Sequence, residues 1–212
     1  MSFQMITPNK TAEILGKFPT ATIYEAAGKV GDMSPNIRPI VPEKSLSGIA
    51  YTVKIFPNDT KAVILALEEA PKGSVLVIDA GGTNRSAVWG GSSSLVSSIR
   101  GIAGCVTNGS VRDVRELIKI GIPVYAAGIS PRGTLKNHEG WSKKTISVGG
   151  VSISTGDYII ADEDGVLVVE ASMGIKLCEL AEKQFEAEHL REKRIKMGET
   201  LSTILGIEKS GN

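Results

Sequence analysis

Apolar residues occur in short blocks along this chain, and the spacing within each block distinguishes strands from helices. Residues 74–79 (SVLVID) and 102–108 (IAGCVTN) are continuous apolar runs, which are typical of strands buried on both faces. Between them, residues 92–100 predict a helix, because a glycine-rich stretch precedes them and Gly101 follows. The middle of the chain therefore predicts the strand–helix–strand order of a parallel sheet.

The same alternation extends in both directions from this segment. Residues 47–56 predict an earlier strand, and the helix that follows it can be capped by Asn58 or Asp59. Residues 113–120 predict a further helix, and residues 122–127 predict the next strand. We therefore expect an α/β fold whose central sheet is mostly parallel.

The last third of the chain has a different pattern. Its short apolar runs are separated by glycine-containing turns, which predicts antiparallel β structure laid against the first sheet. Residues 171–197 predict a long charged helix, and residues 207–212 a frayed tail. Because no linker or internal repeat interrupts the chain, we expect residues 1–212 to form a single domain.

Composition narrows the class of protein without identifying it. The chain is 42% hydrophobic and 22% charged, as in ordinary globular proteins, and its net charge of +1 gives no reason to expect a nucleic-acid or membrane partner. The N-terminal residues lack the features of a signal peptide, and no apolar run approaches the length of a membrane span. We expect a cytoplasmic location.

Two loops at the predicted carboxyl ends of strands are candidates for ligand binding. The first, residues 81–94, is rich in glycine and leads into a helix, so the N–H groups of residues 91–93 would be unpaired donors that favour an anion. The alternative is a glycine-rich turn that only packs. In the second loop, Arg112 can grip a carboxylate and Asp113 offers a hard oxygen ligand for Mg²⁺ or Mn²⁺. The alternative there is a helix start that Asp113 stabilises through the helix dipole.

An acidic group, Asp162 to Asp164, has the composition of a metal cluster, but an acidic turn before Gly165 is the preferred explanation. His138 and His189 have no metal-ligating partner at a usable spacing, so we expect them on the surface.

Four motifs together resemble the RraA-like family: GGTNRSAVWGG (81–91), NGSVRDVREL (108–117), IPVYAAGISPRG (122–133) and GDYIIADEDGVLVV (156–169). That family includes metal-dependent (class II) pyruvate aldolases that act on 4-hydroxy-4-methyl-2-oxoglutarate, regulators of ribonuclease activity, and members long labelled demethylmenaquinone methyltransferase. The resemblance implies a swivelling β/β/α domain with a second β layer and flanking helices. It also implies homotrimers, or hexamers built from them, with active sites between subunits.

The resemblance also implies roles for individual residues. It makes Arg112 a substrate-binding catalytic residue and Asp113 the direct ligand of a divalent cation, Mg²⁺ or Mn²⁺. It assigns binding of the substrate carboxylate to four backbone positions, Gly90, Gly91, Ser92 and Ser93.

One departure from the family pattern concerns Gly91, where the aldolases carry an aspartate that acts near metal-bound water. Its absence bears on the proton-transfer step of aldol cleavage. Glu25, in the early helix, sits where other members often have aspartate and is a candidate to reach a neighbouring subunit's site.

The function that these implications favour is a divalent-metal-dependent lyase. It would cleave a C–C bond of a small 2-oxo acid to give pyruvate, as an aldolase, an oxaloacetate decarboxylase, or both. The first alternative is a non-catalytic regulator that binds a ribonuclease. The second is a methyltransferase, because VLVIDAGG (75–82) superficially resembles the strand and glycine loop that bind S-adenosylmethionine. However, the next strand does not end in the acidic residue that such a site requires.

Overall fold

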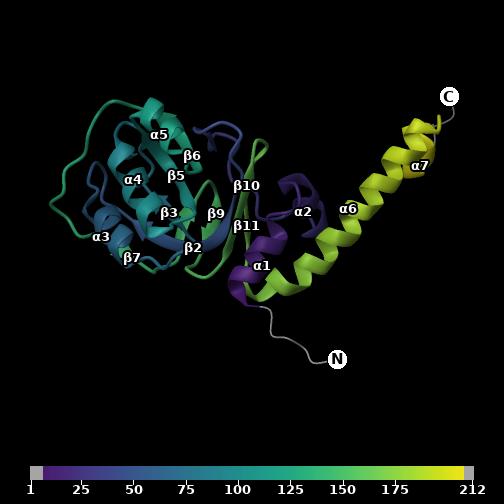
Figure 1. Ribbon diagram of the computed structural model, residues 1–212, viewed down its shortest axis with the longest axis horizontal. Coiled ribbons are helices and arrows are strands. Elements are labelled where there is room, and N and C mark those ends of the chain that lie inside the picture. Colours follow the sequence, from purple (N-terminus) through teal and green to yellow (C-terminus); the bar gives the residue numbers. More distant parts are fainter. Residues whose placement is uncertain (1–6, 208–212) are drawn as a thin grey trace.

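The computed structural model describes residues 7–207, and its centre is a nine-stranded sheet (Figure 1). The strands are β1 (Arg38–Pro39), β2 (Leu46–Lys54), β3 (Ser74–Asp79), β4 (Ala87–Trp89), β5 (Gly104–Val111), β6 (Val124–Ile129), β7 (Trp141–Ser142), β10 (Tyr158–Asp162) and β11 (Gly165–Val169). Their main order is β1-β6-β5-β3-β2-β10-β11, with β4 beside β5 and β7 beside β2. A separate two-stranded sheet consists of β8 (Ile146–Val148) and β9 (Val151–Ile153).

The helices lie outside the sheet. They are α1 (Pro8–Leu15), α2 (Thr20–Ala26), α3 (Lys61–Glu69), α4 (Gly91–Arg100), α5 (Val114–Ile120), α6 (Gly174–Lys196) and α7 (Leu201–Leu205), with a short 3₁₀ helix at Ala171–Met173. Figure 1 shows α3, α4 and α5 together on one side, and α1, α2 and α6 at the end formed by β10 and β11.

The parallel centre predicted from the apolar runs is confirmed. Strands β2, β3, β5 and β6 pair in parallel, and Val77 of β3 lies between Thr52 of β2 and Val106 of β5. All six residues of β3 are buried, as expected for a strand covered on both faces. The helices between these strands are the crossover connections that parallel strands require.

The antiparallel part of the prediction needs a correction. We expected it to be laid against the first sheet, whereas β10 pairs antiparallel with β2 and extends that sheet, and β11 pairs with β10. Among the strands of residues 7–207, only those of the β8–β9 hairpin are separate. The backbone groups on the outer edge of β2 would otherwise lack hydrogen-bond partners, and β10 supplies them.

The two ends of the sheet approach each other. Arg38 of β1 donates a 3.0 Å hydrogen bond to the carbonyl of Asp164, which precedes β11. The sheet is therefore nearly closed, and apolar side chains from its inner face and from the β8–β9 hairpin fill the interior, among them Val77, Val106 and Ile153. Two further apolar clusters join α3 and α5 to one face and α1, α2 and α6 to β10 and β11.

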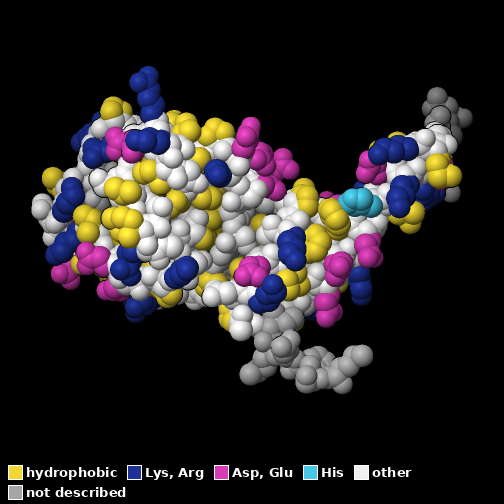
Figure 2. Space-filling model, in the orientation of Figure 1, with side chains coloured by type: hydrophobic (Ala, Val, Ile, Leu, Met, Phe, Trp, Pro, Cys, Tyr) yellow, Lys and Arg dark blue, Asp and Glu magenta, His cyan; other side chains and the backbone are white. Residues whose placement is uncertain are grey.

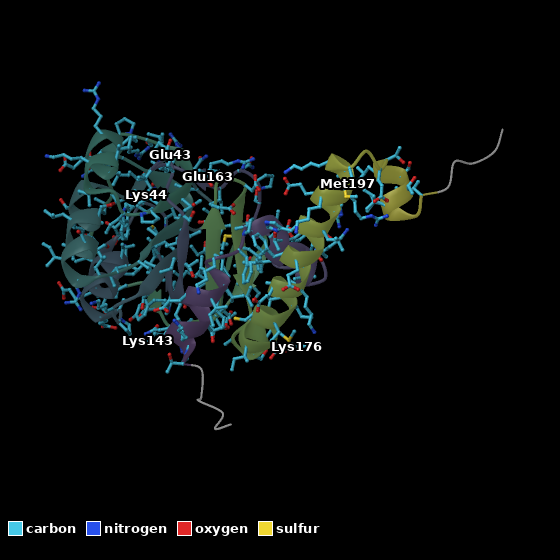
Figure 3. All side chains as sticks on the ribbon, turned by 45° about the vertical axis from the view of Figure 1, so that its right-hand side comes forward. Glu43, Lys44, Lys143, Glu163, Lys176 and Met197 are labelled. Atoms are coloured by element: carbon cyan, nitrogen blue, oxygen red, sulfur yellow. The ribbon has the colours of Figure 1, made fainter. Side chains whose placement is uncertain are left out.

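The long C-terminal helix differs slightly from the predicted 171–197. The 3₁₀ turn comes first, and α6 begins at Gly174 and ends at Lys196. Its first turns pack on the body through Leu177, Cys178 and Ala181, while Met197 at its far end is 83% exposed (Figure 3). The predicted frayed tail, 207–212, lies outside the described residues apart from Ile207.

The surface carries charges of both signs. Figure 2 shows Lys and Arg side chains interspersed with Asp and Glu over the visible face, in agreement with the net charge of +1. Within residues 7–207, none of the helices is both long enough and apolar enough to cross a membrane.

Candidate functional site

The two candidate loops lie side by side because the strands that precede them are paired. Strand β4, which the sequence pattern missed, runs parallel to β5, with Trp89 opposite Val111. Strand β5 also extends to Val111, beyond the end predicted at Asn108. The Arg112 N–H donates to the Trp89 carbonyl at 3.0 Å, so the residues that follow Trp89 and Val111 meet at one edge of the sheet.

Asp113 occupies an unusual backbone conformation at this edge. It is the N-cap residue of α5 with φ of 60°, in the left-handed region that non-glycine residues rarely adopt. Its carboxylate accepts a 3.1 Å hydrogen bond from the Gly91 N–H, and Arg112 Nε lies 3.6 Å away. Both charged side chains are 48% exposed, so each can still reach a ligand. Strained backbone of this kind is common at functional sites.

A side chain at one of the predicted binding positions, Gly90, would press against the Arg112–Asp113 pair. A Cβ at Gly90 would lie 2.8 Å from Asp113 Oδ2 and 3.2 Å from Arg112 Cγ. Helix α4 begins at the next residue, without a side-chain cap. Its first N–H, from Gly91, is engaged by Asp113. Within residues 7–207, the N–H groups of Ser92 and Ser93 have no acceptor, which leaves them as the available anion donors.

These residues line one cavity of about 240 Å³. That size is slightly below the roughly 300–1,000 Å³ of sites for drug-sized ligands, so it suits a smaller acid. Of the six predicted site residues in the two loops, five line the cavity and Gly91 does not. The five are Gly90, Ser92, Ser93, Arg112 and Asp113.

A second part of the cavity wall was missed by sequence reasoning. It consists of the start of α3 and residues 133–136, including Thr60, Thr134 and Lys136. The Thr60 and Thr134 hydroxyls form a 2.7 Å hydrogen bond. No local pattern could have predicted this wall, because the two segments are 74 residues apart in the sequence.

Buried Asp59 fixes that wall. It was expected as a possible cap for α3, and its carboxylate does accept the Lys61 N–H at 2.9 Å, although Thr60 is the N-cap residue. The other carboxylate oxygen accepts the N–H groups of Asn137 and His138 at 2.7 and 3.1 Å. Burial raises the pKa of Asp59, but the three N–H bonds outweigh it, so the pKa lies below the ordinary value.

Glu25 does not belong to this cavity. It lies on α2, and its carboxylate is 3.5 Å from the ammonium of Lys29, which follows the end of that helix. Figure 1 places α2 near α6, away from α4 and α5. Within its own chain Glu25 therefore cannot act on the Arg112–Asp113 pair, and its expected reach into a neighbouring subunit stays a prediction.

The acidic group has a structural role. Asp162 accepts hydrogen bonds from the N–H and hydroxyl of Thr20 and from the N–H of Asp164, so it anchors the start of α2. Figure 3 shows Glu163 on the body of the molecule, at the turn between β10 and β11. These contacts support the acidic turn over a metal cluster.

The chemistry of the cavity fits a loosely held divalent cation. Asp113 is the one carboxylate in the lining, and residues 7–207 contain no group of three His, Cys, Asp or Glu side chains that could enclose a metal. Mg²⁺ typically keeps several waters and binds proteins through one or two carboxylates together with substrate oxygens. A single half-exposed carboxylate beside a helix start with free N–H groups is compatible with that mode.

The chain belongs to the RraA-like family (Aldolase/RraA), whose model matches residues 20–168. A relative from Halalkalibacterium halodurans, named "Putative 4-hydroxy-4-methyl-2-oxoglutarate aldolase", is 32% identical over 177 residues, which cover 84% of each chain.

Two solved structures share the fold. One, described as the RNA-processing inhibitor RraA from Thermus thermophilis, is 29% identical with a TM-score of 0.66, over 71% of this chain and 92% of that one. The other is described as an S-adenosylmethionine-dependent 2-dimethylmenaquinone methyltransferase from Geobacillus kaustophilus. It is 32% identical with a TM-score of 0.67, over 72% and 94%. The family is thereby confirmed, and the three names correspond to the three functions considered from the sequence.

Proposed function

We propose that this protein is a lyase that cleaves a C–C bond of a small 2-oxo acid and releases pyruvate. The observation that carries the proposal is the convergence of Arg112, Asp113 and the free N–H groups at the start of α4 on one cavity. The name of the Halalkalibacterium relative supports the same class of reaction. We also propose that the protein is cytoplasmic and that it acts on a small acid rather than on nucleic acid.

Arg112 and the start of α4 would bind the substrate carboxylate. The guanidinium can donate two parallel hydrogen bonds, and the Ser92 and Ser93 N–H groups add donors at the positive end of the helix dipole. In the free protein Arg112 Nε lies 3.6 Å from Asp113, a long and half-exposed contact that a bidentate carboxylate can replace at little cost.

Asp113 would hold the divalent cation, Mg²⁺ or Mn²⁺, which when bound supplies Lewis-acid stabilisation of the negative charge that develops on the 2-oxo oxygen. The left-handed backbone and the Gly91 N–H fix the orientation of the carboxylate. The chain itself thus provides an oriented carboxylate and, 3.6 Å from it, a guanidinium group in the lining of the same cavity.

Proton transfer distinguishes the two reactions such a site can support. Aldol cleavage needs a group that removes the proton of the substrate hydroxyl, whereas decarboxylation releases CO₂ without that step. At Gly91 the chain lacks the aspartate that the aldolases carry. A Cβ there would lie 3.1 Å from Glu116 Cγ, so the Glu116 side chain fills part of the space. We therefore infer that oxaloacetate decarboxylation is the faster reaction.

The test is pyruvate release from oxaloacetate and from 4-hydroxy-4-methyl-2-oxoglutarate in Mg²⁺, corrected for the rate with metal alone. We expect release from both, faster from oxaloacetate. Gly91→Asp should raise the aldol rate relative to decarboxylation by about 10²-fold, the lower range for a positioned general base. Gly91 has no positive φ, so the new side chain only has to displace the flexible Glu116. No release from either substrate would refute the proposal.

We also propose that the protein is a homo-oligomer, either a trimer or a hexamer built from two trimers. The far part of α6 and helix α7 leave large apolar side chains in solvent, at Leu190, Ile195, Met197, Leu201 and Leu205. Apolar surface of this kind is typical of protein interfaces. Light scattering at micromolar concentration should report a multiple of three chains, and an active monomer would contradict this.

A non-catalytic regulator that binds a ribonuclease is the second candidate, supported by the name of the Thermus neighbour as an RNA-processing inhibitor. It becomes the better account if the purified protein leaves both 2-oxo acids unchanged and binds a ribonuclease. The Geobacillus neighbour, named as a methyltransferase, gives a third candidate, which titration with S-adenosylmethionine tests.

A further inference from the structure

A buried hydrogen bond joins the short strand before the candidate site to the helix that follows it. The indole N–H of Trp89, the last residue of β4, donates to the Ser94 hydroxyl near the start of α4 at 2.7 Å. Trp89 is 2% exposed and Ser94 is fully buried, so water does not compete for this bond. The bond holds its two partners firmly, because breaking it would leave buried polar atoms without a partner.

The connection between β4 and α4 needs such an anchor. It consists of Gly90 and Gly91, and glycine restricts the backbone less than any other residue. Because Gly90 is the N-cap residue, no side chain there bonds to the first N–H groups of α4, as that of serine or aspartate would. The helix start therefore keeps free N–H groups for a ligand but lacks its usual anchor. The bond from Trp89 to Ser94 spans the two glycines and takes the place of that anchor.

Trp89 also fixes the helix start relative to Arg112. Its carbonyl accepts the Arg112 N–H at 3.0 Å, so Trp89 is bonded through its backbone to Arg112 and through its side chain to α4. Another bond at this edge joins the Gly91 N–H to the Asp113 carboxylate at 3.1 Å, and the proposed cation would compete for that carboxylate. The bond between Trp89 and Ser94 involves no charged group, so neither metal nor substrate competes for it.

We propose that Trp89 and Ser94 are positioning residues, whose buried bond keeps the N–H donors of α4 where they can meet the substrate carboxylate held by Arg112. This inference rests on the proposed function and adds to it the groups that orient the carboxylate site. Donors that are already in place bind an anion more tightly, because the anion does not have to order the helix start. Loss of the bond should therefore weaken substrate binding more than it slows the cleavage step.

The test is steady-state decarboxylation of oxaloacetate in Mg²⁺ by two single variants and their double variant. Ser94→Ala and Trp89→Phe each remove one partner of the bond, and each should raise KM about tenfold, the equivalent of one neutral hydrogen bond, with a smaller fall in kcat. The double variant should be no worse than the single variants, because both substitutions break the same bond. A loss of folded protein alone would instead lower the apparent kcat and leave KM unchanged.

Ser97→Ala is the matched control. Ser97 is also fully buried on α4, three residues after Ser94, and within residues 7–207 its hydroxyl has no hydrogen-bond partner. Its removal should leave KM unchanged, and the thermal midpoint verifies the folding of every variant. Wild-type KM in folded Ser94→Ala, additive effects in the double variant, or an equal rise in KM for Ser97→Ala would overturn the inference and leave the lyase proposal intact. If the wild-type protein releases no pyruvate, the proposed function fails and this inference fails with it.

Discussion

Asp113→Asn should lower kcat for pyruvate release by about 10²–10³-fold while the protein stays folded. The substitution removes the negative charge that would hold the divalent cation, and loss of one element of transition-state charge stabilisation typically costs that much. Asparagine suits the position because it tolerates the left-handed conformation at φ of 60°. Its amide oxygen can also still accept the Gly91 N–H, now bonded at 3.1 Å.

Glu116→Gln is the control for this experiment. It removes a carboxylate from the same helix, α5, and from the neighbourhood of Gly91, but Glu116 does not line the cavity. Its effect on decarboxylation should be several-fold at most. Circular dichroism and the thermal midpoint verify the folding of both variants. If the folded Asp113→Asn variant retained wild-type turnover, Asp113 would serve only as the N-cap residue of α5.

The parallel half of the fold could be predicted because its strands are unambiguous. The fully buried β3 has a continuous apolar run, and helix α4 ends at Gly101 in the left-handed conformation that glycine favours. The apolar runs did not predict the structure correctly where strand pairing, rather than composition, decides it. Strand β5 continues past Gly109 and Ser110, with an irregular register, because β4 and β6 pair with it on both sides.

The placement of β10 could not be predicted for a related reason. Its short apolar run predicts a strand but contains no information on the partner, and the partner, β2, is about a hundred residues earlier in the chain. The prediction of antiparallel structure was correct, and the prediction of a layer apart from the first sheet was wrong for β10 and β11.

One wall of the candidate site was visible in the sequence and the other was not. Arg112 and Asp113 stood out because adjacent opposite charges follow an apolar run, and residues 90–93 because glycines precede a helix start. Lys136 is an ordinary lysine in a polar loop. Long-range contacts bring that loop to the cavity, among them the hydrogen bonds of Asp59 with Asn137 and His138, 78 and 79 residues away.

Removal of divalent cations should abolish turnover and leave the fold intact. Asp113 is the one carboxylate in the cavity lining, so a cation there would be held by one protein oxygen, water and substrate, and a chelator should extract it readily. The apolar clusters of the core do not depend on Asp113, so the thermal midpoint should change little. Mg²⁺ or Mn²⁺ should restore activity because both prefer oxygen ligands.

The direct measurement is the rate of pyruvate release from oxaloacetate by the wild-type protein after treatment with EDTA, and again after excess Mg²⁺ is added. The rate with Mg²⁺ alone is subtracted, because the free ion also promotes decarboxylation. We predict no enzymatic release in EDTA and recovery of the full rate with Mg²⁺. Undiminished release after exhaustive chelation, or no release above the Mg²⁺ background, would contradict a metal-dependent site at Arg112 and Asp113.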